Sequence, residues 1–216
     1  MYDIKELTKE IHQNAERQEF VKTLMSGTIH PELYAIYLYN QLQCYSVLEK
    51  YGMHNDLFRQ TPGLQRAEKL DRDFKKLWTK KERPVITDST KAYCEHIETI
   101  MEDPEKLYAH IYVRHLGDLS GGQILKGIAK KALNPREGEG LHFYDFPRIE
   151  DAKAFKTEYR STLDNLDLTR EQKAALVEES NYAFKLNMDM FNEMKGSATK
   201  SLLILLRNTL FPFMNK

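Results

Sequence analysis

Residues 112–127 read Tyr-Val-Arg-His-Leu-Gly-Asp-Leu-Ser-Gly-Gly-Gln-Ile-Leu-Lys-Gly, which places Gly117, Gly121 and Gly122 inside a segment of otherwise helical pattern. Each glycine in a helix interior costs about 1 kcal/mol relative to alanine. Positions 117 and 121 are four residues apart, so they share one helix face with 122 beside them. We expect a strip of bare backbone that either seats a neighbouring helix or lies against a flat ligand, with room to bend. Asp118 is the carboxylate interleaved with this glycine strip.

The rest of the chain also has a helical pattern and shows no sustained alternation typical of strands. The spacing predicts an all-α, single-domain irregular helical bundle over 1–196. Helices are expected over 4–24, 31–49, 63–78, 88–101, from 104 through the glycine strip, 149–163 and 170–195, with a loop over 134–147. Pro31, Asp103-Pro104 and a Thr169–Gln172 capping box mark helix starts. Gly196-Ser197 is expected to separate a short apolar extension, 197–216, that packs on the bundle or flanks it.

Composition limits the classes of partner. The 216 residues contain 32 basic and 32 acidic side chains, so no overall charge favours nucleic acid or an anionic membrane. Cys44 and Cys94 are expected to be small buried side chains in a reducing compartment. The strongest apolar run, Leu202–Leu206, is far shorter than the roughly 20 residues that span a bilayer. We expect a cytoplasmic protein with no transmembrane segment.

Four polar residues share one face of the first predicted helix. Lys5, Lys9, His12 and Glu16 are spaced four, three and four residues apart. Lys9 lies about 4.5 Å and Lys5 about 10 Å along the axis from His12, at 1.5 Å per residue. Taken alone, this histidine is more often a hydrogen-bonded boundary residue, and the lysines a solvated face. Together they suit a ligand held by His12 through a metal, with carboxylates at its rim.

A second cationic pair, Lys156 and Arg160, lies one helical turn apart beside aromatic neighbours. This pair too would by itself be interpreted as a solvated helix face.

With these features combined, the chain resembles the heme oxygenase family over most of its length. The block Gly-Asp-Leu-Ser-Gly-Gly-Gln at 117–123 matches the family signature of the distal helix. Residues 12–20 match the segment of the proximal histidine, and 155–160 and 183–187 match later family motifs in the right order. The resemblance implies the heme oxygenase fold, with heme between a proximal and a kinked distal helix.

The resemblance also implies roles for particular residues. His12 would be the proximal ligand of the heme iron, with Glu16 one turn on as its partner. The residues expected to engage the heme propionates are Lys5, Lys9, Tyr112, Lys156 and Arg160. Gly117, Gly121 and Gly122 would let the backbone approach the heme face. Asp118 would hold a distal water network with Tyr45, Arg114 and Asn187, and Phe184 would be an apolar wall.

The implied reaction is oxidative cleavage of heme b by O2 and external electrons, giving biliverdin, CO and ferrous iron. The glycine strip would keep acidic side chains away from the reacting oxygen, and Asp118 would place the water that delivers a proton. The electron donor would be a ferredoxin, a flavodoxin or a flavoprotein reductase, and we expect a monomer. His110 and His115 are expected to be packing or outward-facing residues and not distal bases.

Two other functions remain open from the sequence. A heme-binding carrier or sensor without turnover would share most of the same binding residues. A non-heme di-iron carboxylate protein needs Glu-x-x-His motifs on facing helices, and the only such pair here, Glu139 and His142, falls in a glycine-rich loop.

Overall fold

The computed structural model describes residues 3–17, 29–59, 61, 63–133 and 139–210. Every regular element in these ranges is helical, which confirms the predicted all-α class. The elements are α1 (Ile4–Leu7), α2 (Lys9–Glu16), α4 (Pro31–His54), α5 (Ala67–Leu77), α6 (Asp88–Thr99), α7 (Pro104–Asp118), α8 (Gly121–Leu133), the 3-10 helix η2 (His142–Tyr144), α9 (Ala152–Asp164) and α10 (Arg170–Leu210).

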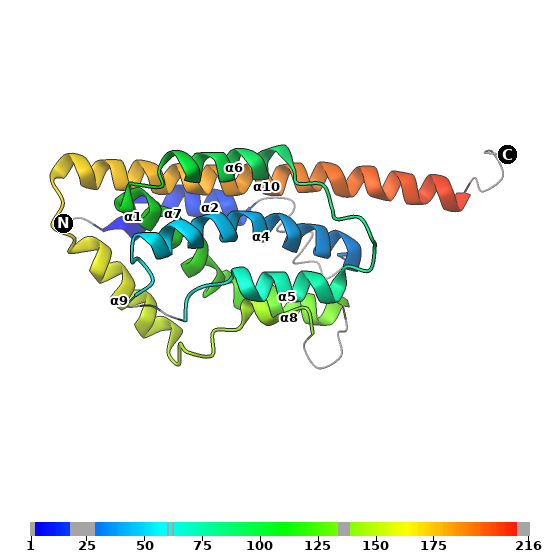
Figure 1. Cartoon of the computed structure of the whole chain (residues 1–216), viewed down its shortest axis with the longest axis horizontal. Helices are drawn as coiled ribbons and strands as arrows, with labels where there is room; N and C mark the ends of the chain where they lie inside the picture. The colour runs from blue at the N-terminus through cyan, green and yellow to red at the C-terminus, as the bar shows by residue number, and fades with distance from the viewer. Residues whose placement is uncertain (1–2, 18–28, 60, 62, 134–138, 211–216) are drawn as a thin grey trace.

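Two long helices organise the bundle. α4 packs against α5, α6 and α7, and α10 packs against α7, α2 and α6. In Figure 1, α6 and α10 run side by side along one edge, α4 crosses the middle, and α5 and α8 occupy the opposite edge. One apolar core lies around α6, α7, α9 and α10, and a second joins α4 to α5, α8 and η2. The N-terminal pair of helices is held from two sides, since α1 contacts α9 and α2 contacts α10.

The predicted helix starts are confirmed by their capping bonds. Asp103 accepts from the backbone N–H of Lys106 at 3.1 Å, and Pro104 is at the start of α7. Thr169 and Gln172 form the reciprocal capping box, at 2.9 Å and 3.2 Å. Such bonds involve only residues close in sequence, so they can be predicted without the fold.

The first helix differs from the prediction, because residues 4–24 do not form one continuous helix. Thr8 ends α1 and separates it from α2, and its hydroxyl donates to the carbonyl of Ile4 at 2.8 Å. A threonine hydroxyl offers the backbone an alternative to regular helical bonding. α2 ends at Glu16, and residues 18–24 of the predicted helix lie outside the described part of the chain.

The glycine strip bends as expected. α7 ends at Asp118 and α8 begins at Gly121, with Leu119 and Ser120 forming the turn between them. The Ser120 backbone N–H donates to the carbonyl of Gly117 at 3.1 Å, and its hydroxyl donates to the carbonyl of Leu116 at 2.9 Å. The backbone bond spans three residues instead of four and so tightens the end of α7, and the distal segment is two helices and not one.

The expected break at Gly196-Ser197 is wrong. α10 continues from Arg170 to Leu210, and in Figure 1 its C-terminal part extends beyond the other helices. A single interior glycine lowers helix stability by about 1 kcal/mol without ending the helix. The side chains of 195–210 and the whole of 211–216 lie outside the description, so packing of the extension on the bundle stays a prediction.

Smaller differences concern helix ends. α4 runs to His54, past the expected end at 49, and α5 begins at Ala67 instead of 63. The buried Arg66 explains the later start of α5, because its guanidinium donates to the carbonyls of Leu64 at 2.9 Å and Gly63 at 2.7 Å and so holds this turn out of the helix. Within the described ranges, none of the helices has both the length and the apolar character needed to traverse a bilayer.

Candidate active site

A pocket of about 290 Å³ lies between the N-terminal helices and α7. Its volume is at the lower limit of the roughly 300–1,000 Å³ typical of small-molecule sites. The residues that line it are Lys5, Glu6, Thr8, Lys9, His12, Tyr112, Val113, Leu116, Gly117, Ser120, Arg160 and Phe184. Seven of the residues singled out in the sequence are therefore neighbours here, although they come from α1, α2, α7, α9 and α10.

His12 forms one wall of the pocket. The edge of its imidazole meets the ring of Phe184, with centroids 5.5 Å apart and planes at 82°. Phe184 is buried in α10, so it limits how far the imidazole can turn. The expected partner of His12, Glu16, ends α2, and its side chain is outside the description.

Backbone without side chains forms another part of the lining. A Cβ atom added to Gly117 would meet no heavy atom within 4 Å, so the space beside it is open to a ligand. Gly121 is open in the same way but is not among the lining residues. Gly122 has a packing position instead, because a Cβ there would lie 3.2 Å from Cδ1 of Tyr144. Gly117 and Gly121 therefore face open space, whereas Gly122 allows close packing against Tyr144.

The rim of the pocket is cationic. Lys156 does not line the pocket itself, but its Nζ donates to the hydroxyl of the lining residue Ser120 at 2.9 Å. Burial lowers the pKa of Lys156, and the nearby charges of Arg160 and Lys5 lower it further. The Nε of Arg160 is buried and has no hydrogen-bond partner within the described ranges. Lys9 pairs with Glu6 at 2.9 Å on the exposed side. Crowded like charges and a buried donor without a partner favour an anionic ligand such as a carboxylate.

Asp118 lies beside this pocket, at the end of α7. The buried Tyr45 of α4 donates a short hydrogen bond to Oδ2 of Asp118. Burial raises the pKa of Asp118 to about 7, against the lowering effect of the Tyr45 hydroxyl and the positive charges of Arg114 and Arg66. A carboxyl group with this pKa exchanges protons readily near neutral pH, as a proton-transfer group requires.

Arg114 lies behind Tyr45. Its guanidinium is over the Tyr45 ring, 4.8 Å from the centroid, and its Nη1 donates to Oε1 of Gln41 at 2.8 Å. Asn187, on α10, donates to the carbonyl of Ala183 at 2.8 Å. Neither Arg114 nor Asn187 lines the pocket, so the water network expected from them stays a prediction.

Sequence reasoning missed the partners of His115. This histidine is fully buried, and its Nε2 lies 3.1 Å from Oε1 of Glu49. Its ring packs edge-on against Tyr45 at 5.0 Å. Burial lowers its pKa, so the imidazole is neutral at pH 7. A packing role is thus confirmed and an outward orientation is wrong. Glu49 carried no sequence signal, because its partner is 66 residues away.

The Glu-x-x-His pair of the di-iron hypothesis is engaged elsewhere. Glu139 pairs with Lys76 at 2.9 Å, and Nδ1 of His142 lies 2.8 Å from the buried Asp73. These contacts tie the loop to α5. Among the described residues, neither Glu139 nor His142 belongs to a group of three possible metal ligands, whereas a di-iron site needs several carboxylates and histidines together.

Comparison with known proteins identifies the family to which this pocket belongs. Residues 2–193 match the family model described as heme oxygenase. The chain is 38% identical over 211 residues to heme oxygenase 1 of Nostoc sp., which aligns 94% of this chain with 89% of that protein. It is 37% identical over 209 residues to heme oxygenase 1 of Bos taurus, covering 91% of this chain and 72% of that one. The crystal structure of heme oxygenase-1 from the cyanobacterium Synechocystis sp. in complex with heme has a TM-score of 0.84 at 34% identity, covering 96% of this chain and 97% of that chain. With this likeness along nearly its whole length, the chain belongs to the heme oxygenase family.

Proposed function

We propose that this protein binds heme b in the pocket between α2 and α7 and cleaves it oxidatively to biliverdin, CO and ferrous iron. The observation that carries the proposal is that His12 and the side-chain-free backbone at Gly117 line one pocket, which has cationic side chains around it. A flat, iron-bearing macrocycle with two carboxylates matches each of these features. Heme supplies the iron that activates O2 and is also the molecule that is oxidised.

The chain's own residues position this ligand. His12 offers an imidazole nitrogen to the iron, and the Phe184 ring holds the imidazole in place. Lys5, Lys156 and Arg160 pair with the propionates, which fixes how the macrocycle is rotated in its plane. The donor left without a partner on Arg160 supports this role.

Asp118 and the glycine face direct the chemistry. Gly117 has no side chain, so the backbone there brings no acidic group next to the ligand. The space beside it is open, because a Cβ atom at this position would meet no heavy atom within 4 Å. Asp118, with its pKa raised to about 7, holds and returns a proton through a water molecule, while Tyr45 fixes the carboxyl group. Proton delivery is thereby limited to one position beside the ligand.

The finer features of the reaction belong to the same proposal. O2 is the oxidant, and the electrons come from an external donor such as a ferredoxin, a flavodoxin or a flavoprotein reductase. We expect a monomer that acts in the cytoplasm.

Turnover of the heme complex tests the proposal. The complex is incubated with ascorbate, or with a reductase, under air, and the Soret band and the chromatographic identity of the product are followed. We expect loss of the band and formation of biliverdin. Heme that stays intact through many equivalents of reductant would instead establish a carrier or sensor.

The ligand assignment has its own test. His12→Ala should abolish the spectrum of histidine-ligated heme, and His54→Ala, at the exposed end of α4, should leave it unchanged. An unaltered spectrum in the His12 variant would remove His12 as the ligand.

A further inference from the structure

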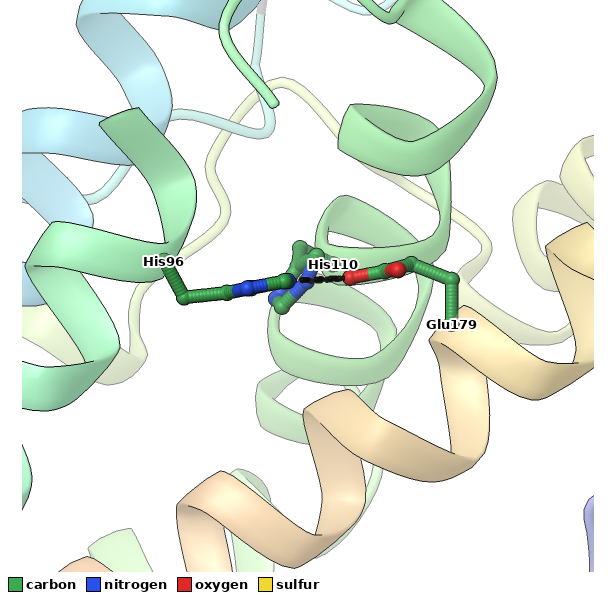
Figure 2. A group of neighbouring side chains, drawn as sticks. All are labelled: His96, His110 and Glu179. Atoms are coloured by element: carbon green, nitrogen blue, oxygen red, sulfur yellow. Dashed lines mark hydrogen bonds and ion pairs between the residues drawn. The ribbon is translucent and has the colours of Figure 1, made fainter. Parts of the chain in front are cut away.

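A second group of metal-ligating side chains lies on the other side of α7. His96 comes from α6, His110 from α7 and Glu179 from α10, and their ligand atoms all lie within 4.8 Å of one another. Figure 2 shows the two imidazoles and the carboxylate converging from three separate helices. Oε1 of Glu179 lies 2.5 Å from Nε2 of His96 and 2.8 Å from Nε2 of His110. It is the one such group of three among the described residues.

We propose that His96, His110 and Glu179 form a binding site for one first-row divalent transition cation, of which Zn²⁺ is the reference ion. Two imidazole nitrogens and one carboxylate oxygen are a donor set that Zn²⁺ and Fe²⁺ both accept, whereas Mg²⁺ and Ca²⁺ prefer oxygen alone. With three protein ligands, the fourth position is taken by water. This site is separate from the pocket that contains His12.

The ligand positions need only a small adjustment to take an ion. Bonds of about 2.05 Å in a tetrahedral site place neighbouring ligand atoms about 3.3 Å apart. The observed separations of 2.5 Å and 2.8 Å therefore have to open by less than about 1 Å, and the separation of the two imidazole nitrogens, which is at most 4.8 Å, has to close by no more than about 1.5 Å. His96 can supply this movement, since 20% of its side chain is exposed. The same exposure provides an entry path for the ion, whereas the His110 side chain is completely buried.

The groups around the ligands suit a metal site. The Tyr93 hydroxyl lies 2.6 Å from Nδ1 of His110. In the metal-free protein Nε2 faces the Glu179 carboxylate and carries the ring proton, and the Tyr93 hydroxyl donates to Nδ1. When Nε2 binds the ion, the ring proton is on Nδ1 and is donated to the Tyr93 hydroxyl oxygen, so the neutral imidazole keeps one proton throughout. Such outer partners fix the orientation of a ligating histidine.

The position of the site gives it a structural consequence for the pocket. His110 and Tyr112 are two residues apart on α7, so their side chains point to nearly opposite sides of the helix. A cation at His110 joins α7 to α6 and α10 on one side, while Tyr112 lines the pocket on the other. Binding of the ion is therefore expected to stabilise the helix that forms the pocket wall.

Metal titration of the full-length, heme-free protein tests the proposal. Co²⁺ serves as the spectroscopic probe, because its visible d–d bands report a tetrahedral site with nitrogen ligands, and Zn²⁺ should displace it. We expect one Co²⁺ per chain and a rise of the thermal midpoint that depends on Zn²⁺ concentration, as for any ligand that binds only the folded state. Mg²⁺ should give neither effect.

Three variants locate the ion. His96→Gln and Glu179→Gln should lose the bands, and Tyr93→Phe should weaken binding about 10–100-fold by removing the partner of His110. Circular dichroism establishes that each variant is folded. His12→Ala controls for binding at the heme pocket, and it should retain the bands.

Two results would overturn the inference. One is wild-type protein that takes up no more Co²⁺ than the His96 variant. The other is binding that survives in both glutamine variants but is lost in the His12 variant, which would place the ion in the heme pocket. A hydrogen-bonded triad without affinity for metals gives the first of these results.

Discussion

Replacing Asp118 by asparagine should stabilise the heme-free protein while it impairs turnover. Burial raises the pKa of Asp118 from its ordinary value of 3.8 to about 7, so the charged carboxylate is unfavourable in the folded state. The difference between these two pKa values corresponds to an upper limit of about 4 kcal/mol in the free energy of unfolding, at about 1.36 kcal/mol per pKa unit. Because the carboxyl group is only partly buried, we expect a gain of about 1–2 kcal/mol in the free energy of unfolding. Asparagine keeps an oxygen that accepts the Tyr45 hydrogen bond.

The gain from this substitution must depend on pH. Below about pH 4 the carboxyl group is protonated in both states, so aspartic acid and asparagine are equally neutral. As pH rises from about 4 to 7, the folded state retains a proton that the unfolded state has released, and the wild-type protein loses stability. Above pH 7 the carboxyl group is ionised in both states, and the difference in stability between the wild-type protein and the variant reaches its full value. The free energy of unfolding of the variant should therefore exceed that of the wild-type protein by more at pH 8 than at pH 5.

Urea denaturation of both heme-free proteins at pH 5 and pH 8 measures this difference. Asp167→Asn, at an exposed position between α9 and α10, is the control and should change little at either pH. An equal gain at the two pH values, or a less stable Asp118 variant at pH 8, would refute the reasoning. In the activity assay the variant should still bind heme, form little biliverdin and act as a weak peroxidase. Biliverdin formation at the wild-type rate would mean that Asp118 does not place the proton.

Two further variants probe the pocket directly. Gly117→Ala and its control Gly127→Ala both add a methyl group into open space on a helix, so each should raise the free energy of unfolding by about 0.5–1 kcal/mol in urea titrations. Only the change at Gly117 should weaken heme binding or slow biliverdin formation, and equal activity of the two variants would argue against a heme face there. Arg160→Met should lower heme affinity about 10–100-fold in a Soret titration, as expected for the loss of one charge-assisted hydrogen bond. Lys153→Met, on the exposed start of α9, should leave that affinity unchanged, and a similar loss in both variants would point to a general charge effect.

Much of the helical framework was predictable because its signals are local. A cap such as Asp103, a proline in the first turn and the Thr169–Gln172 box each act within four residues. The break at Thr8 and the continuation of α10 through Gly196 were missed, since both depend on a small local preference that surrounding contacts can reinforce or override.

The sequence alone determined the helical class, the order of the helices and, through its motifs, the family and the candidate histidine. Only the tertiary structure decided what each residue meets. It divided the glycine strip into an open face at Gly117 and a packing contact at Gly122, and it set the raised pKa of Asp118. It also brought His96 and Glu179, 83 residues apart, to one point. Periodicity and capping act within one or two turns, whereas burial and charge at a site depend on helices that meet only when the chain has folded.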